Sequence, residues 1–299
     1  MLLIGSITFA LMIMGLVVVF NGLIAPSPDV TDTSNDVDEA AEYNGEVRRN
    51  ARTLLIHTNH QEVYASKSDL NDTAERHFGN YSRLLAESYA ASGPVYVNAT
   101  YDGPVAYGHR TVQHEENDFT HGSNDWSPVD SPNEIGWFVV NLNLSDVSND
   151  PFRIVVENDT GETMGYEFTK NGSTVTAVDI DVTRSGTPLA EATCQPFSGR
   201  TLLDLLDGES FTSSCSMPGV SAMDGPYEVT FEHGDRVRGK YSIVTRGAPN
   251  NGVPNCASPP QNPCRSPVVW SVNVTTTYES PGVSYTNGQN VSVYGGSEA

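Results

Sequence analysis

The feature that most constrains this chain is an apolar stretch at residues 1–24, MLLIGSITFALMIMGLVVVFNGLI, which contains no charged residue. A helix rises about 1.5 Å per residue, so a helix of this length spans the roughly 30 Å hydrocarbon core of a bilayer. A secretory signal peptide is the alternative, but such a peptide has basic residues before a shorter apolar centre. The first basic residue here is Arg48. We therefore predict a transmembrane helix at residues 1–24.

The segment that follows, residues 25–36 (APSPDVTDTSND), has two prolines and no apolar periodicity, and is predicted to be a linker. Lysine and arginine, which normally set membrane orientation, are missing on both sides of the apolar stretch. We expect the rest of the chain to lie outside the cell. The protein would then be a single-pass protein of the cell membrane with an extracellular C-terminal domain, and the lipid bilayer would be one of its partners.

Charge is the second constraint. The chain has 37 acidic and 16 basic residues and a formal net charge of −21, and its lysines are Lys67, Lys170 and Lys240. A chain without a basic stripe cannot neutralise phosphates, so we predict no binding to nucleic acid. Acidity spread along a chain is typical of proteins from halophiles, where salt screens the self-repulsion.

The period of the apolar residues changes at Gly93-Pro94. Before this point apolar residues recur every three or four positions at about 37–57 and 68–91, which predicts a helical hairpin within residues 37–93. Beyond it the period is two, so the fold class is mainly β, with an antiparallel β-sandwich-like exterior domain over residues 94–299. Strands are expected at 95–101, 104–114, 135–144, 152–158, 163–169, 174–183, 226–232, 237–246, 267–278 and 290–294, with a long loop at 115–134 and a short helix at 201–207.

An apolar helix ahead of a large β-rich exterior resembles the mature form of archaeal type IV pilins and pilin-like proteins. The stretch LLIGSITFALMIMGLVVVFNGL and the later FGNYSRLLAESYA are similar to haloarchaeal membrane-anchored proteins grouped with them. This chain departs from bacterial pilins at Gly5, where those proteins carry glutamate, and no basic leader precedes Met1. The resemblance implies that residues 1–24 contact copies of the same chain or other pilin-like subunits.

The cysteines are Cys194, Cys215, Cys256 and Cys264. Four cysteines in an extracellular chain predict disulfide bonds with three possible connectivities. We favour Cys194–Cys215 and Cys256–Cys264, because each pair closes a short loop that lacks a core of its own. A zinc site is the alternative, but the chain has no C-x-x-C pair and no histidine near these cysteines.

Asn-x-Ser/Thr sequons are more frequent than chance supplies, which suggests a glycosylated surface protein. The candidate glycosylation sites are Asn71, Asn80, Asn98, Asn143, Asn158, Asn171, Asn273 and Asn290. Some of these asparagines are expected to serve only in turns.

Three further patterns could bind a ligand or a metal. Residues 109–121 contain six potential metal ligands, His109, His114, Glu115, Glu116, Asp118 and His121, yet their spacing matches no H-E-x-x-H motif, and an exposed polar loop explains them better. Asp179 and Asp181 are expected on a solvated strand edge, and the acidic segment 146–150 could bind calcium. Trp126, Trp137 and Trp270 could line a carbohydrate platform, although core packing explains Trp137 and Trp270.

No catalytic motif appears in the sequence, so we predict no enzymatic activity, no cofactor and no metal. The expected function is that of a membrane-anchored extracellular protein, either a pilin-like filament subunit or a cell-surface component. The alternatives are a carbohydrate- or ligand-binding surface module that does not polymerise, and a metal-dependent hydrolase.

Overall fold

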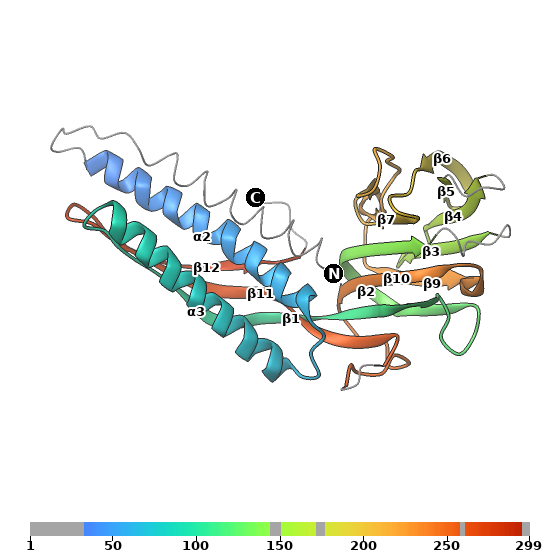
Figure 1. Ribbon diagram of the computed structural model, residues 1–299, viewed down its shortest axis with the longest axis horizontal. Coiled ribbons are helices and arrows are strands. Elements are labelled where there is room, and N and C mark those ends of the chain that lie inside the picture. The colour runs from blue at the N-terminus through green and yellow to red at the C-terminus, as the bar shows by residue number, and fades with distance from the viewer. Residues whose placement is uncertain (1–32, 144–150, 172–176, 258–260, 295–299) are drawn as a thin grey trace.

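The structure is a computed structural model that describes residues 33–143, 151–171, 177–257 and 261–294 (Figure 1). The predicted transmembrane helix at 1–24, most of the predicted linker and the acidic segment 146–150 lie outside the described residues. Among the residues that are described, no helix is both long and apolar enough to cross a membrane.

Two helices precede the strands. Helix α2 (Thr33–Gln61) begins inside the predicted linker, and α3 (Lys67–Ser92) begins after Ser66, whose hydroxyl accepts a hydrogen bond from the Asp69 amide at 3.1 Å. Both helices lie along one face of the strands β12, β11 and β1 (Figure 1). Their buried residues follow the predicted helical spacing: Tyr43, Val47, Ala51 and Leu55 on α2, and Leu70, Ala74, Phe78 and Leu85 on α3.

The remainder is antiparallel β-structure, which confirms a mainly β fold with two helices. The strands are β1 (Tyr96–Asp118), β2 (Trp126–Asn143), β3 (Phe152–Asn158), β4 (Thr163–Asn171), β5 (Ala177–Arg184), β6 (Thr187–Cys194), β7 (Arg200–Asp204), β8 (Glu209–Ser210), β9 (Tyr227–Glu232), β10 (Arg238–Arg246), β11 (Cys264–Glu279) and β12 (Ser284–Ser292). They pair in the order β12-β11-β1-β10-β2-β9-β3-β4-β5-β6, with β7 between β2 and β8.

Two hydrophobic cores divide the molecule into a helical half and a β half. In the helical half, which consists of α2, α3, β11, β12 and the first part of β1, the helices cover the sheet. In the β half, which contains the other strands, the rings of Phe119 and Tyr241 lie 5.5 and 5.1 Å from Phe231. Because Tyr241 belongs to β10 and Phe231 to β9, two layers of strands face each other across this core.

The long strands β1 and β2 connect these parts. Strand β1 pairs with β11 from Tyr96 to Val112 and with β10 from His109 to Asp118. Strand β2 pairs with β9 through its first residues and with β7 through its last, while β10 lies along its other side. The two layers of the β half are therefore joined by continuous hydrogen bonding.

Two dipeptides with the composition of a turn lie within strands. Asp102-Gly103 was expected to separate two strands, but it forms a bulge within β1, where Gly103 has a φ of +104°. Asn287-Gly288 lies within β12, with Gly288 opposite Thr275. Gly103 can adopt this positive φ because it has no side chain. Pairing with β11 continues past both dipeptides, in β1 for Asp102-Gly103 and in β12 for Asn287-Gly288.

The expected loop at 115–134 is shorter than predicted, covering 119–125, and the expected helix at 201–207 is wrong. Strand β1 continues to Asp118, and β2 already begins at Trp126. In 201–207, Thr201, Leu203 and Leu205 are fully buried, so burial alternates as in a strand, and Leu203 pairs with Val140. Tertiary pairing with β2 outweighed the local leucine-rich pattern.

The acidic composition predicts that the folded chain needs salt. We expect the thermal unfolding midpoint of residues 33–299 to rise by at least about 5 °C between low salt and molar potassium chloride, because ions screen the net negative charge. The measurement is circular dichroism during heating. An equal rise in sucrose at matched osmolality would attribute the effect to solute exclusion and contradict charge screening.

Candidate functional site

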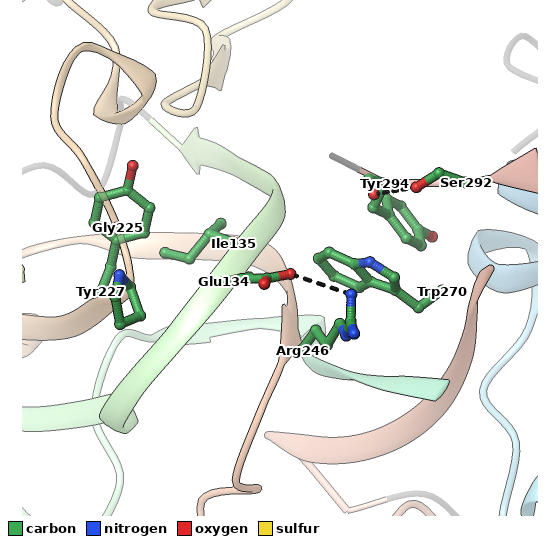
Figure 2. Close-up of a pocket in the computed structure, with 9 residues that line it drawn as sticks. Glu134, Ile135, Gly225, Tyr227, Arg246, Trp270, Ser292 and Tyr294 are labelled. Carbon is green, nitrogen blue, oxygen red and sulfur yellow. Dashed lines mark hydrogen bonds and ion pairs between the residues drawn. The ribbon is translucent and has the colours of Figure 1, made fainter. Parts of the chain in front are cut away.

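A pocket of about 650 Å³ opens where the helical half meets the β half (Figure 2). Five separate parts of the chain form it: β2, the segment before β9, β10, β11 and the end of β12. The lining residues are Glu134, Ile135, Gly225, Pro226, Tyr227, Arg246, Trp270, Ser292 and Tyr294.

Aromatic residues form one wall. The rings of Trp270 and Tyr294 are 5.5 Å apart with an interplanar angle of 44°, and both side chains are largely enclosed by neighbours. Strand β2 can pass this wall only because residue 136 is glycine. A Cβ atom at Gly136 would lie 2.3 Å from the Cβ of Tyr294. The wall is therefore packed tightly and pre-formed.

A charged pair lies beside the aromatic wall (Figure 2). Glu134 and Arg246 are opposite each other in the β2–β10 register, with Arg246 Nη1 3.6 Å from Glu134 Oε2. Their side chains keep 60% and 50% of their accessible surface, so both remain able to contact a ligand. Exposed hydrogen-bonding groups beside a buried aromatic wall suit a polar ligand.

Buried polar groups hold the pocket wall against α2. The Tyr294 hydroxyl is 2.9 Å from His60 Nε2, and the His60 ring centroid lies 4.7 Å from that of Trp137. Burial, followed by the nearby charge of Arg110, lowers the pKa of His60 to about 3. Burial raises the pKa of Tyr294. Both groups are therefore neutral at neutral pH.

Acid should destabilise the protein through His60. The folded state keeps this imidazole neutral down to a pKa of about 3, whereas the unfolded chain binds a proton near pH 6.5, so stability is lost as pH falls below that value. We expect the free energy of unfolding of the wild type, relative to His60→Gln, to fall by about 1.4 kcal/mol between pH 7.5 and pH 5.5. Urea unfolding at both pH values measures it, with His57→Gln, at an exposed position of α2, as the control.

The end of α2 is fixed to the sheet by two polar side chains. Arg110, on β1, donates from Nη1 to the carbonyl oxygens of Asn59, His60 and Glu62 at 3.1, 3.4 and 3.2 Å, and from Nε to Ser242 Oγ at 3.0 Å. These carbonyls belong to the C-terminal end of α2, where the helix dipole favours a cation. Burial lowers the pKa of Arg110.

Asn59 completes this attachment. Its side chain is fully buried, donates to the carbonyl oxygen of Val269 at 2.8 Å and accepts from the amide of Val269 at 2.9 Å. The Asn59 side-chain amide therefore forms with the Val269 backbone the two hydrogen bonds that a neighbouring strand would form.

The disulfide prediction is confirmed. Cys194 and Cys215 have Cα atoms 5.3 Å apart, and Cys256 and Cys264 have Cα atoms 4.9 Å apart. The first bond joins the end of β6 to the segment after β8. The second closes the loop that leads into β11.

The six potential metal ligands of 109–121 do not lie in one exposed loop, because five of them, all but His121, lie in β1 and successive side chains of a strand point to opposite faces. Glu116 contacts Arg200 and Asn143, and its pKa is lowered, first by the hydrogen bond from Asn143 and then by Arg200. Asp118 pairs with Arg238 at 3.4 Å, and His121 Nε2 lies 3.1 Å from the carbonyl oxygen of Gly252. Within the described part of the chain, no three histidine, cysteine, aspartate or glutamate residues gather as metal ligands.

The three tryptophans do not form one platform. Trp126 was expected in a loop, but it is buried in the β half and donates to the carbonyl oxygen of Phe119 at 2.9 Å. Trp137 packs against the core of the helical half, and only Trp270 lines the pocket. Asp179 accepts hydrogen bonds from Asn171 and Thr193 at 3.0 and 2.7 Å, while Asp181 is exposed.

Sequence reasoning missed most of the pocket. Glu134, Arg246, Tyr227 and Tyr294 are far apart in the chain and share no spacing, so only strand register could have brought them together. Comparison with protein-family models, curated proteins and solved structures gives no match to this chain. The functional proposal therefore rests on the sequence pattern and on the geometry of the described residues.

Proposed function

We propose that this chain is a non-enzymatic, membrane-anchored extracellular protein of pilin-like type, which acts as a filament subunit or a cell-surface component. Residues 1–24 would be the anchor. The observation that carries the proposal is the position of α2, which begins at Thr33, shortly after the apolar stretch, at the end of the elongated body farthest from the β half (Figure 1). An anchor at this end would place the β half away from the membrane.

The attachment of α2 supports this role. The helix has 29 residues, and at about 1.5 Å per residue it extends over roughly 43 Å. Arg110 and Asn59 fix its far end to β1 and β11. A helix attached in this way would hold the folded domain in a fixed orientation relative to an anchor at the N-terminal end of α2.

Disulfides and composition agree with an extracellular location. Disulfide bonds persist in oxidising compartments, and this chain has two. The net charge of −21 suits a surface exposed to high salt.

Fractionation of cells tests the anchor. The full chain is expected in the membrane fraction and accessible to protease added to whole cells, while a chain that lacks residues 1–24 is expected in the soluble fraction. Retention of the shortened chain in the membrane fraction would contradict the proposal. Mass spectrometry of sheared surface appendages then separates a filament subunit, present among their components, from a component that never assembles.

The pocket favours a second candidate function, a ligand-binding surface module that does not polymerise. The exposed Glu134–Arg246 pair at this pocket can form hydrogen bonds with sugar hydroxyls. Titration with neutral disaccharides, followed by tryptophan fluorescence, tests it. Arg246→Ala should abolish a signal that Arg48→Ala, on the exposed face of α2, leaves intact.

A further inference from the structure

The eight sequon asparagines differ in the environment of their amide nitrogen, and one of them, Asn80, is exposed on α3. Asn158 is 6% exposed, donates from Nδ2 to the carbonyl oxygen of Asp224 at 3.0 Å, and accepts from the amides of Thr160 and Glu162. Nδ2 also donates to Glu162 Oε2 at 3.3 Å, so a sugar on this nitrogen would displace one of its two hydrogen bonds beside the turn between β3 and β4. Asn158 therefore has a structural role.

Four other asparagines form side-chain hydrogen bonds, three of them from Nδ2 and Asn71 through Oδ1. Asn143 and Asn171 donate from Nδ2 to Glu116 and to Asp179, respectively. Asn98 donates to Thr100 Oγ1 and accepts from Ser82, and Asn71 accepts from the hydroxyl of Tyr101. All four are half-buried.

Asn273 and Asn290 have a different environment. They are register partners on β11 and β12, both are exposed, and Asn290 Nδ2 donates to Asn273 Oδ1 at 3.1 Å. The neighbouring residues Val272, Val274 and Val291 are buried in the core under the helices. Because strand side chains alternate, the two asparagines lie on the sheet face opposite α2 and α3.

A hollow of about 330 Å³ lies beside this pair. Gly288 contributes no side chain to it, and Thr275 Oγ1 donates to Asp102 Oδ2 at 2.6 Å along its wall. The hollow is lined by Asp102, Asn273, Thr275, Gly288, Gln289 and Asn290. The Gln289 side chain donates to Asn44 of α2, so the side chains that face the hollow are those of Asp102, Asn273, Thr275 and Asn290, all of them polar. Its oxygen and amide groups can form hydrogen bonds with sugar hydroxyls.

We infer that the Asn273/Asn290 pair is an N-glycosylation site whose first sugar lies in the hollow over Gly288. This inference rests on the proposed extracellular location. A glycan would come from a lipid-phosphate-linked oligosaccharide through a membrane oligosaccharyltransferase. The asparagine Nδ2 loses a proton to a base of that enzyme and bonds to sugar C1, while the C1–O bond to phosphate breaks and the lipid phosphate leaves.

The pair accommodates one glycan at a time. Opposed residues of antiparallel strands have Cα atoms roughly 5 Å apart, which is less than the width of a sugar chain. Modification of Asn273 keeps its Oδ1 as the acceptor for Asn290, so the cross-strand hydrogen bond survives.

Peptide mass spectrometry of the full chain from its native cells tests this inference. We expect a glycan mass on the peptide that contains Asn273 or on the one that contains Asn290, and unmodified Asn158 and Asn171. The double variant Asn273→Gln/Asn290→Gln should lose that mass, and the control Asn171→Gln should retain it. A glycan on Asn158, or an unmodified pair, would overturn the inference.

Protease treatment of whole cells separates this outcome from a failure of the proposed function. If the chain is cleaved on intact cells but the pair is unmodified, the glycan inference is wrong and the surface location stands. If the chain is neither cleaved nor modified, both are wrong.

Discussion

Replacing Arg110 by methionine is expected to lower the free energy of unfolding by about 3 kcal/mol. The change removes the donors to three carbonyl oxygens at the end of α2 and to Ser242 Oγ. Hydrogen bonds from a charged donor contribute about 1.5–3 kcal/mol each, but loss of the buried cation also removes its desolvation cost, so the net effect is smaller than the sum. Urea unfolding of residues 33–299 in molar salt measures it.

Arg48→Met is the matched control for Arg110→Met, because Arg48 is an exposed arginine on α2. This substitution should change stability by less than about 0.5 kcal/mol. A loss below about 1 kcal/mol for Arg110→Met would show that the helix end is held mainly by apolar packing.

Removal of the Cys194–Cys215 disulfide should lower the free energy of unfolding by an amount similar to that expected for Arg110→Met. The two cysteines are 21 residues apart in sequence, and in the chain-entropy model a loop of this length stabilises the fold by about 3 kcal/mol. Cys194 is also fully buried in the core of the β half. We expect Cys194→Ser/Cys215→Ser to lose at least that amount, because two hydroxyls then replace apolar sulfur.

The second disulfide provides the comparison. Cys256 and Cys264 are 8 residues apart, so the same model gives a smaller loss for Cys256→Ser/Cys264→Ser. Urea unfolding of both double variants under identical conditions shows which variant loses more free energy of unfolding. The reverse order would mean that native packing around Cys264 outweighs the chain-entropy difference.

Local periodicity was sufficient to predict the helices, because the stripe of Val47, Ala51 and Leu55 has helical spacing and is buried as expected. It failed where partners far away in the sequence decide the conformation. Asp102-Gly103 has the composition of a turn, yet β11 pairs with β1 on both sides of it. The residues of 201–207 have a helix-like pattern, yet β2 fixes them as a strand and a turn.

The disulfides were predictable because each pair is close in sequence, whereas the pocket was not. Glu134 meets Arg246 only through the register of β2 with β10, and Trp270 meets Tyr294 only after β12 has paired with β11. Trp126 shows the same limit, since the aromatic core that buries it comes from β9 and β10. Long-range strand order is the missing information in each case.

The length of β1 has a consequence for how copies of this protein would be displayed. Its 23 residues pair with β11 in one half and with β10 in the other, with an overlap from His109 to Val112. Bending between the halves would break several backbone hydrogen bonds at once, so the angle between them is fixed. Every copy in an array would therefore present the tip of its β half at the same height and in the same direction relative to the axis of α2.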